Sequence, residues 1–72
     1  MRLRDIREDQ DITQSEIAEY LNVRQNTYSQ YETEKRQIPI ETLIKLAQYF
    51  DTSVDYILNL TDEKKPYPRK VF

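Results

Sequence analysis

The 72-residue sequence contains no glycine, cysteine, histidine or tryptophan. Without cysteine or histidine, the chain forms no disulfide and lacks the usual ligands of zinc sites. No apolar run approaches the roughly 20 residues that span a bilayer, and the N-terminal segment MRLRDIRED lacks the apolar stretch of an export signal. We therefore expect a cytoplasmic protein with no membrane partner, no cofactor, no metal and no evident small-molecule ligand.

Length and charge suggest one small domain followed by a tail. A chain of this size buries only about 60% of its unfolded surface, so the core is modest. Residues 1–60 carry seven Lys/Arg and eleven Asp/Glu, whereas residues 61–72 carry four and two. Helical periodicity ends near Leu60, and Pro66 and Pro68 follow. We expect a domain over residues 1–60 and an extended or flexible tail over 61–72.

The most informative stretch is TQSEIAEYLNVRQNTYSQYET, residues 13–33. Apolar residues recur there at helical spacing on both sides of a break: Ile17, Ala18 and Leu21, then Tyr28 and Tyr31. Asn22 can adopt the left-handed conformation that ends a helix, and Thr13 with Glu16 has the form of a capping box. The pattern predicts two short helices joined by a tight turn, a helix-turn-helix.

The same spacing predicts three further helices. One runs from Arg2 to about Glu8, one begins at Pro39 and ends at Asp51, and one is capped by Ser53. Their apolar stripes comprise Leu3, Ile6, Leu43, Leu46, Ala47, Phe50, Val54, Ile57 and Leu58. The expected fold class is therefore all-α, with five helices.

From about Leu3 to Leu60, the sequence resembles the phage-repressor and Cro type of helix-turn-helix DNA-binding domain. Five segments match in register, namely LRDIRED, ITQSEIAEYLNV, YSQYE, IPIETLIKLAQYF and SVDYIL. The resemblance implies a compact, lambda-repressor-like domain whose second and third helices contact double-stranded DNA. It also implies a transcriptional regulator, and the absence of histidine, cysteine and a glycine-rich phosphate loop argues against an enzyme.

The absence of glycine is the sharpest departure from that family. The family commonly has glycine at four helix ends that are occupied here by Asp11, Asn22, Glu34 and Asp51. Asn and Asp tolerate the left-handed backbone best among the other residues, so three of the four replacements are physically sensible. We expect the loop at Glu34 to adopt a different conformation.

The outer face of the predicted third helix is polar and nearly uncharged; it comprises Gln25, Asn26, Ser29 and Gln30. Gln and Asn offer a donor and an acceptor at a fixed separation, which is what adenine requires in the major groove. We predict that these four residues and Arg24 read bases. Alternatively, the amides only keep the surface soluble, and Arg24 is a solvated surface arginine.

Phosphate contacts are expected at two places. At the start of the second helix, with Thr13 and Gln14, free backbone N–H groups and the helix dipole favour an anion. The resemblance implies that Gln14 also braces Gln25. It further implies a phosphate clamp in the loop after the third helix, at Thr33, Lys35 and Arg36. The two cations there are alternatively ordinary loop charges.

The resemblance also implies a structural ion pair, between Arg7 in the first helix and Glu32 at the end of the third.

Two functions remain open. One is a sequence-specific repressor that binds a palindromic operator as a homodimer, with half-sites about 34 Å apart. The other is a protein-interaction module of the same fold, an antitoxin or an anti-repressor, which the acidic charge and the missing loop glycine favour. Candidate dimer contacts are Tyr56, Leu60, Tyr67, Val71 and Phe72.

Overall fold

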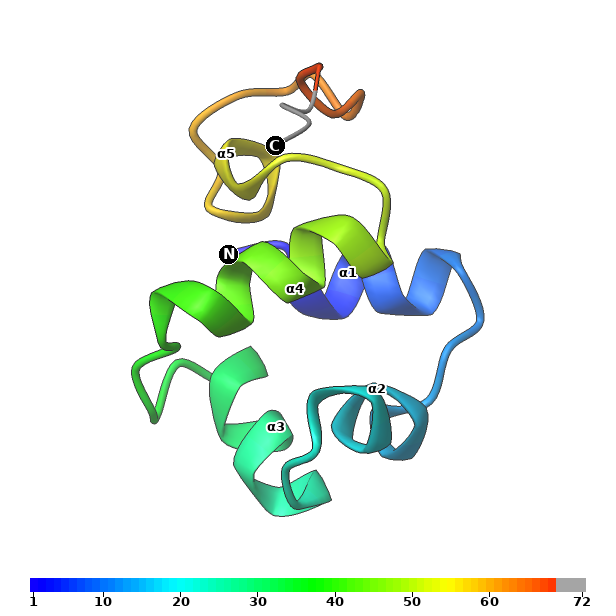
Figure 1. Ribbon diagram of the computed structural model, residues 1–72, viewed down its shortest axis with the longest axis vertical. Coiled ribbons are helices and arrows are strands. Elements are labelled where there is room, and N and C mark those ends of the chain that lie inside the picture. Colours follow the sequence, from blue (N-terminus) through cyan, green and yellow to red (C-terminus); the bar gives the residue numbers. More distant parts are fainter. Residues whose placement is uncertain (69–72) are drawn as a thin grey trace.

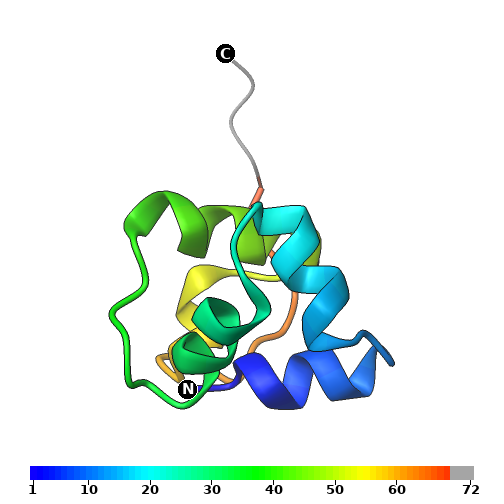
Figure 2. The same cartoon turned by 90° about the horizontal axis from the view of Figure 1, so that it is seen from below.

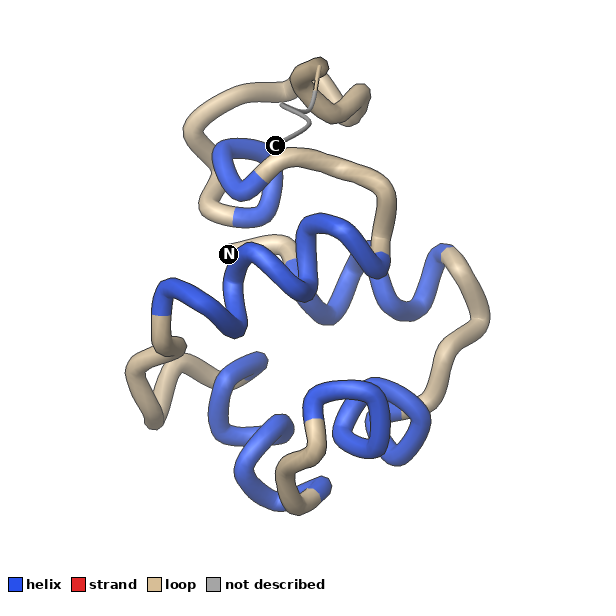
Figure 3. The backbone as a smooth tube through the Cα atoms, in the orientation of Figure 1, coloured by secondary structure: helices blue, strands red, loops and turns tan. Residues whose placement is uncertain are grey.

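The computed structural model describes residues 1–68 and contains five helices and no strand within that range (Figures 1 and 3). The helices are α1 (Leu3–Asp9), α2 (Gln14–Leu21), α3 (Gln25–Glu32), α4 (Ile40–Tyr49) and α5 (Val54–Ile57). The all-α, five-helix prediction is confirmed. The fourth helix is shorter than expected, because Phe50 and Asp51 belong to its C-terminal cap rather than to the helix.

The helices enclose a single core. In Figure 1, α2 and α3 lie together below α1 and α4, and α5 lies on the opposite side of that pair. Seen from below, α1 and α4 lie on opposite sides of the molecule, with α2 running along one edge between them (Figure 2). None of the helices within residues 1–68 is long and apolar enough to cross a membrane.

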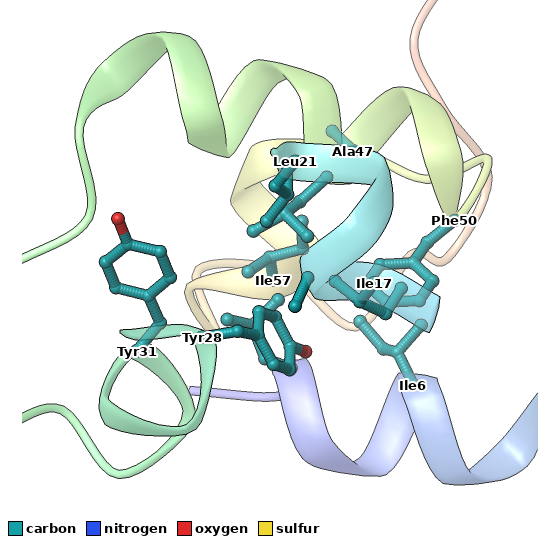
Figure 4. Close-up of a cluster of buried hydrophobic side chains, with 11 residues drawn as sticks. Ile6, Ile17, Leu21, Tyr28, Tyr31, Ala47, Phe50 and Ile57 are labelled. Carbon is teal, nitrogen blue, oxygen red and sulfur yellow. The ribbon is translucent and has the colours of Figure 1, made fainter. Parts of the chain in front are cut away.

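The core is built from the predicted apolar stripes. Every helix contributes to it, and its buried members are Leu3, Ile6, Ile17, Ala18, Leu21, Tyr28, Tyr31, Leu46, Ala47, Phe50 and Ile57. Figure 4 shows the Tyr28 ring pointing into the cluster of buried side chains. Leu43, Val54 and Leu58, which we expected in the core, are only half-buried. Packing of these amphipathic faces stabilises helices too short to persist alone.

All five helices end in the same motif, although the chain has no glycine. After α3, the Lys35 N–H donates to the Gln30 carbonyl at 2.9 Å and the Glu34 N–H donates to the Tyr31 carbonyl at 3.2 Å. These two bonds define a Schellman cap, and Glu34 takes the left-handed conformation with φ 61°. Equivalent bond pairs close the other helices, with Asp11, Asn22, Asp51 and Asn59 as the left-handed residues.

Our expectation of a different loop at Glu34 is therefore wrong, and Asn59 was not foreseen as left-handed. The left-handed region costs a non-glycine residue about 1–2 kcal/mol. At Glu34, two backbone hydrogen bonds oppose that cost by satisfying carbonyl groups at the end of α3. The turn therefore keeps the geometry that glycine would favour.

Replacement of Glu34 by glycine should raise the free energy of unfolding by about 0.5–1 kcal/mol, because relief of the Cβ clash exceeds the added entropy of the unfolded chain. Urea denaturation would measure the change. Glu34→Gln is the matched control: it keeps Cβ and removes only the carboxylate, which lies 3.6 Å from the N-terminal ammonium. Equal stability of the two variants would contradict the left-handed strain.

Residues 61–68 contain no helix and lie near α5 (Figure 1). The Thr52 hydroxyl donates to the Lys64 carbonyl at 2.6 Å, and the Tyr67 hydroxyl donates to Asp55 Oδ2 at 3.0 Å. Arg2 Nη2 lies 2.7 Å from Asp62 Oδ1, which links this segment to the start of the chain. Hydrogen bonds thus attach the segment to the helical domain.

The candidate dimer contacts have different surroundings. Leu60 and Tyr67 are 72% and 59% exposed. Tyr56 is half-buried, and the guanidinium carbon of Arg2 lies 4.2 Å from the centre of its ring. Val71 and Phe72 lie outside the described residues. Exposed Leu60 and Tyr67 stay available for a dimer contact, which remains a prediction.

Candidate nucleic-acid interface

Helix α2, which leads into the turn before α3, is capped at both of its ends. The Thr13 hydroxyl oxygen accepts from the Glu16 N–H at 3.1 Å, and Glu16 Oε2 accepts from the Thr13 N–H at 3.2 Å. This is the predicted capping box. At the other end, Asn22 is left-handed with φ 57°, and the Val23 N–H donates to the Ala18 carbonyl at 3.0 Å. The start of α3 is thereby held at a defined place beside α2.

The outer face of α3 carries the predicted base-reading residues. Gln25 and Asn26 are exposed, and Ser29 and Gln30 are half-buried on the side away from the core. Arg24 precedes the helix, is exposed, and caps it without a side-chain hydrogen bond, as expected for arginine. The structure thus places these five residues along one surface, and both interpretations of Arg24 stay open.

The only acidic residue of α3 faces away from that surface. The Glu32 side chain is 2% exposed, and Arg7 Nε donates to its Oε2 at 2.6 Å. Arg7 Nη2 also donates to Glu32 Oε1, at 3.3 Å, so the pair is a two-pronged contact between α1 and α3. Because this negative charge is enclosed and paired, the outer face of α3 presents no carboxylate of its own to a polyanion.

Two more hydrogen bonds extend the ion pair. Gln14 Nε2 donates to Glu32 Oε1 at 3.0 Å, and Arg7 Nη1 donates to the Ile12 carbonyl at 2.9 Å. The network therefore joins α1, the α1–α2 loop, α2 and α3. The resemblance implied the Arg7–Glu32 pair, but neither of these two additional bonds was foreseen.

The network changes the proton affinity of its members. Burial alone favours a neutral Glu32, but the hydrogen bonds from Arg7 and Gln14 outweigh burial and lower the pKa of this carboxyl. Burial raises the pKa of Tyr28 well above its ordinary value, and the neighbouring Glu32 carboxylate adds to that rise. The Tyr28 hydroxyl forms no hydrogen bond of standard geometry within residues 1–68. The network is ionised, and Tyr28 is neutral, at physiological pH.

The start of α2 has the features of a phosphate contact. First-turn N–H groups have no acceptor inside a helix, so those of Gln14 and Ser15, which precede the capped Glu16 N–H, are suited to donate to an anion. A shallow depression of about 510 Å³ adjoins them, lined by Arg7, Glu8, Asp11, Ile12, Thr13, Gln14 and Gln25. Gln14 and Gln25 share this depression, but the Gln14 amide donates to Glu32. Bracing of Gln25 by Gln14 stays a prediction.

The loop after α3 carries the second group of predicted phosphate contacts. Thr33, Lys35 and Arg36 are all exposed. The Thr33 hydroxyl donates back to the Ser29 carbonyl at 3.2 Å, so it must turn before it can donate to a phosphate. Arg36 Nε donates to Gln30 Oε1 at 2.8 Å, a contact that links the two predicted groups and that was not foreseen. The contact depends on the reversal of the chain at Glu34, which the sequence pattern did not predict.

Residues 1–68 contain no group of three or more Asp, Glu, His or Cys side chains that could hold a metal ion. The arrangement instead offers amides and hydroxyls on α3, free N–H groups at the start of α2, and cations at both ends of α3. These groups can donate to and accept from base edges and donate to phosphate oxygens.

Comparison with known proteins gives consistent matches. A family profile described as helix-turn-helix matches residues 3–57. The uncharacterized HTH-type transcriptional regulator YobD of Bacillus subtilis is 40% identical over 65 residues, which cover 90% of this chain and 58% of that protein. The HTH-type transcriptional regulator ImmR of Bacillus subtilis is 38% identical over 64 residues, covering 89% and 50%.

A phage protein matches as well. The cryptic phage CTXphi transcriptional repressor RstR of Vibrio cholerae is 34% identical over 53 residues, covering 74% of this chain and 48% of that protein. The chain thus spans about half the length of the curated relatives that it matches. No solved structure matches at a significant level.

Proposed function

Because the chain belongs to the helix-turn-helix family of the phage-repressor and Cro type, we propose that it is a sequence-specific, double-stranded-DNA-binding transcriptional regulator acting as a repressor in the cytoplasm. One observation carries the proposal: the outer face of α3 presents amides and a hydroxyl, while the acid of that helix is enclosed with Arg7. A helix of this kind suits hydrogen-bond readout in the major groove. Relatives named as transcriptional regulators and as a phage repressor support it.

In this proposal, α3 enters the major groove. Gln25, Asn26, Ser29 and Gln30 contact base edges, and Arg24 contacts DNA at the start of the helix. Thr13 and Gln14 hold one phosphate through the start of α2, and the loop of Thr33, Lys35 and Arg36 holds another. The net charge of −2 makes binding by one monomer weak and sensitive to salt.

A homodimer on a palindromic operator follows from the size of one module. A single small domain contacts too little DNA for tight specificity, so two copies would occupy half-sites about 34 Å apart. Exposed Leu60 and Tyr67 are the described candidates for the dimer contact. Light scattering on the full chain and on a chain truncated after residue 60 would test whether the tail forms the dimer contact. An unchanged number of chains per particle would exclude the tail from that contact.

Paired substitutions test the readout. Once in vitro selection has provided a preferred DNA, Gln25→Ala should weaken binding to it by about 1–3 kcal/mol and relax the base preference at one position. Lys35→Ala should weaken binding to all sequences about equally. It should also reduce the slope of log affinity against log salt concentration by about one, as expected for the loss of one phosphate contact. Fluorescence anisotropy at several salt concentrations measures both. A uniform loss in both variants would refute base reading by Gln25.

The alternative of a protein-interaction module has lost one of its two arguments. It rested on the acidic charge and on the missing glycine after the third helix. Glu34 adopts the left-handed conformation that a glycine would supply there, so the missing glycine no longer argues for a different loop. The acidic charge remains, but it does not extend to the outer face of α3. The absence of any salt-dependent binding to random-sequence DNA would restore this alternative.

A further inference from the structure

Gln30 is held at two points by the chain that follows α3. Its backbone carbonyl accepts from the Lys35 N–H at 2.9 Å, and its side-chain Oε1 accepts from Arg36 Nε at 2.8 Å. The left-handed residue Glu34 reverses the chain between them, which brings Arg36 back alongside the helix that it has just left. The side-chain contact is therefore built on a fixed backbone turn.

The Arg36 contact determines which way the Gln30 amide faces. A guanidinium has only donors, so it pairs with Oε1 and never with the Nε2 amide group. The orientation of the amide thus follows from chemistry and not from an arbitrary choice between oxygen and nitrogen. Held in this way, Gln30 has one of its two acceptor lone pairs occupied, while its NH2 group remains a donor.

The pair as a whole is rich in donors. Within residues 1–68, the hydrogen bond of the Arg36 guanidinium uses Nε, which leaves the N–H groups of Nη1 and Nη2 as further donors on the guanidinium that contacts the Gln30 amide. Guanine presents two acceptors in the major groove, O6 and N7, whereas adenine presents a donor and an acceptor. Adjacent donors from two side chains match guanine. An unpaired glutamine instead matches adenine.

Resting on the proposed function, we propose that Arg36 is a specificity-determining residue that switches Gln30 from adenine to guanine. Arg36 orients the Gln30 amide and adds donors of its own, so that the two side chains together contact O6 and N7 of one guanine. For Arg36, this role replaces the phosphate contact that the resemblance implies and that is proposed above, and it leaves that contact to Thr33 and Lys35. It predicts an effect on base identity, which a phosphate contact does not produce.

The test is in vitro selection from random double-stranded DNA with the full chain and with three variants. Gln30→Ala identifies the base position that Gln30 governs. Arg36→Met removes the donors and keeps a side-chain stem, and Lys35→Met is the matched control that removes the neighbouring cation. Because the Lys35 and Arg36 side chains are exposed, thermal melts should show that Arg36→Met and Lys35→Met fold like the unsubstituted chain.

The unsubstituted chain should prefer guanine over adenine by about tenfold at the position that Gln30 governs. Arg36→Met should shift that position to adenine and leave the other positions unchanged, whereas Lys35→Met should lower affinity without changing any base. Adenine preference in the unsubstituted chain, or a uniform loss with Arg36→Met like that of Lys35→Met, would overturn the inference alone. A chain that selects no sequence at all would overturn the proposed function together with it.

Discussion

Arg7→Ala should lower the free energy of unfolding by about 3–5 kcal/mol, because it leaves the Glu32 carboxylate enclosed without its cation. Arg7 is 14% exposed and Glu32 is 2% exposed at the side chain, so solvent cannot replace the lost partner. For a domain of this size, each kcal/mol shifts the melting temperature by about 4–8 °C. Thermal denaturation followed by circular dichroism would measure the loss directly.

Arg4→Ala is the matched control for that variant. Arg4 lies on the same helix and pairs with Glu8 at 3.4 Å, but the two side chains are 71% and 53% exposed. Exposed pairs contribute only about 0–1 kcal/mol, so this variant should melt close to the unsubstituted protein. Equal melting temperatures for the Arg7 and Arg4 variants would show that the Arg7–Glu32 pair has no special role.

The ion pair should also make stability depend on pH. The pKa of Glu32 is lower in the folded state than in the unfolded chain. Its contribution to stability is therefore complete above the unfolded pKa, about 4.3, and is lost as the pH falls through the lower folded value. Glu32→Gln lacks this titration. The difference in stability between the unsubstituted protein and Glu32→Gln should shrink on acidification.

Local patterns predicted the helices because each signal acts within one turn of the chain. Apolar spacing located the buried faces, the capping box marked the start of α2, and Asn22 marked its end. The loop at Glu34 was mispredicted for a related reason. Residue preference argues against a left-handed glutamate, but the two backbone bonds of the Schellman cap outweigh a cost of about 1–2 kcal/mol.

Side-chain contacts across the fold were the harder part. Arg7 and Glu32 are 25 positions apart, so no periodicity joins them, and only the resemblance suggested the pair. The bond from Arg36 to Gln30 depends on the reversal at Glu34, which was itself mispredicted. The candidate interface could thus be located from the sequence as a set of residues. The hydrogen bonds that orient those residues required the folded backbone.

Ile57→Ala should lower the free energy of unfolding by about 2–5 kcal/mol, because it leaves a cavity where α5 closes the core. The Ile57 side chain is fully buried (Figure 4), and the carbonyl of the same residue accepts from the Arg2 N–H at 2.8 Å. A helix of four residues has no stability of its own, so tertiary packing must hold α5 in place. Urea denaturation would report the loss.

Leu60→Ala is the control, since it truncates an aliphatic side chain of the same size that is 72% exposed; it should change stability by no more than about 0.5 kcal/mol. The pair of variants also separates stability from readout. Neither residue lies on the outer face of α3. At a temperature where both variants are folded, Ile57→Ala should therefore bind DNA as tightly as the unsubstituted chain. Leu60→Ala should bind DNA more weakly only through loss of the dimer contact proposed for Leu60. If Ile57→Ala were as stable as Leu60→Ala, this result would contradict the inference that packing of Ile57 holds α5 against the core.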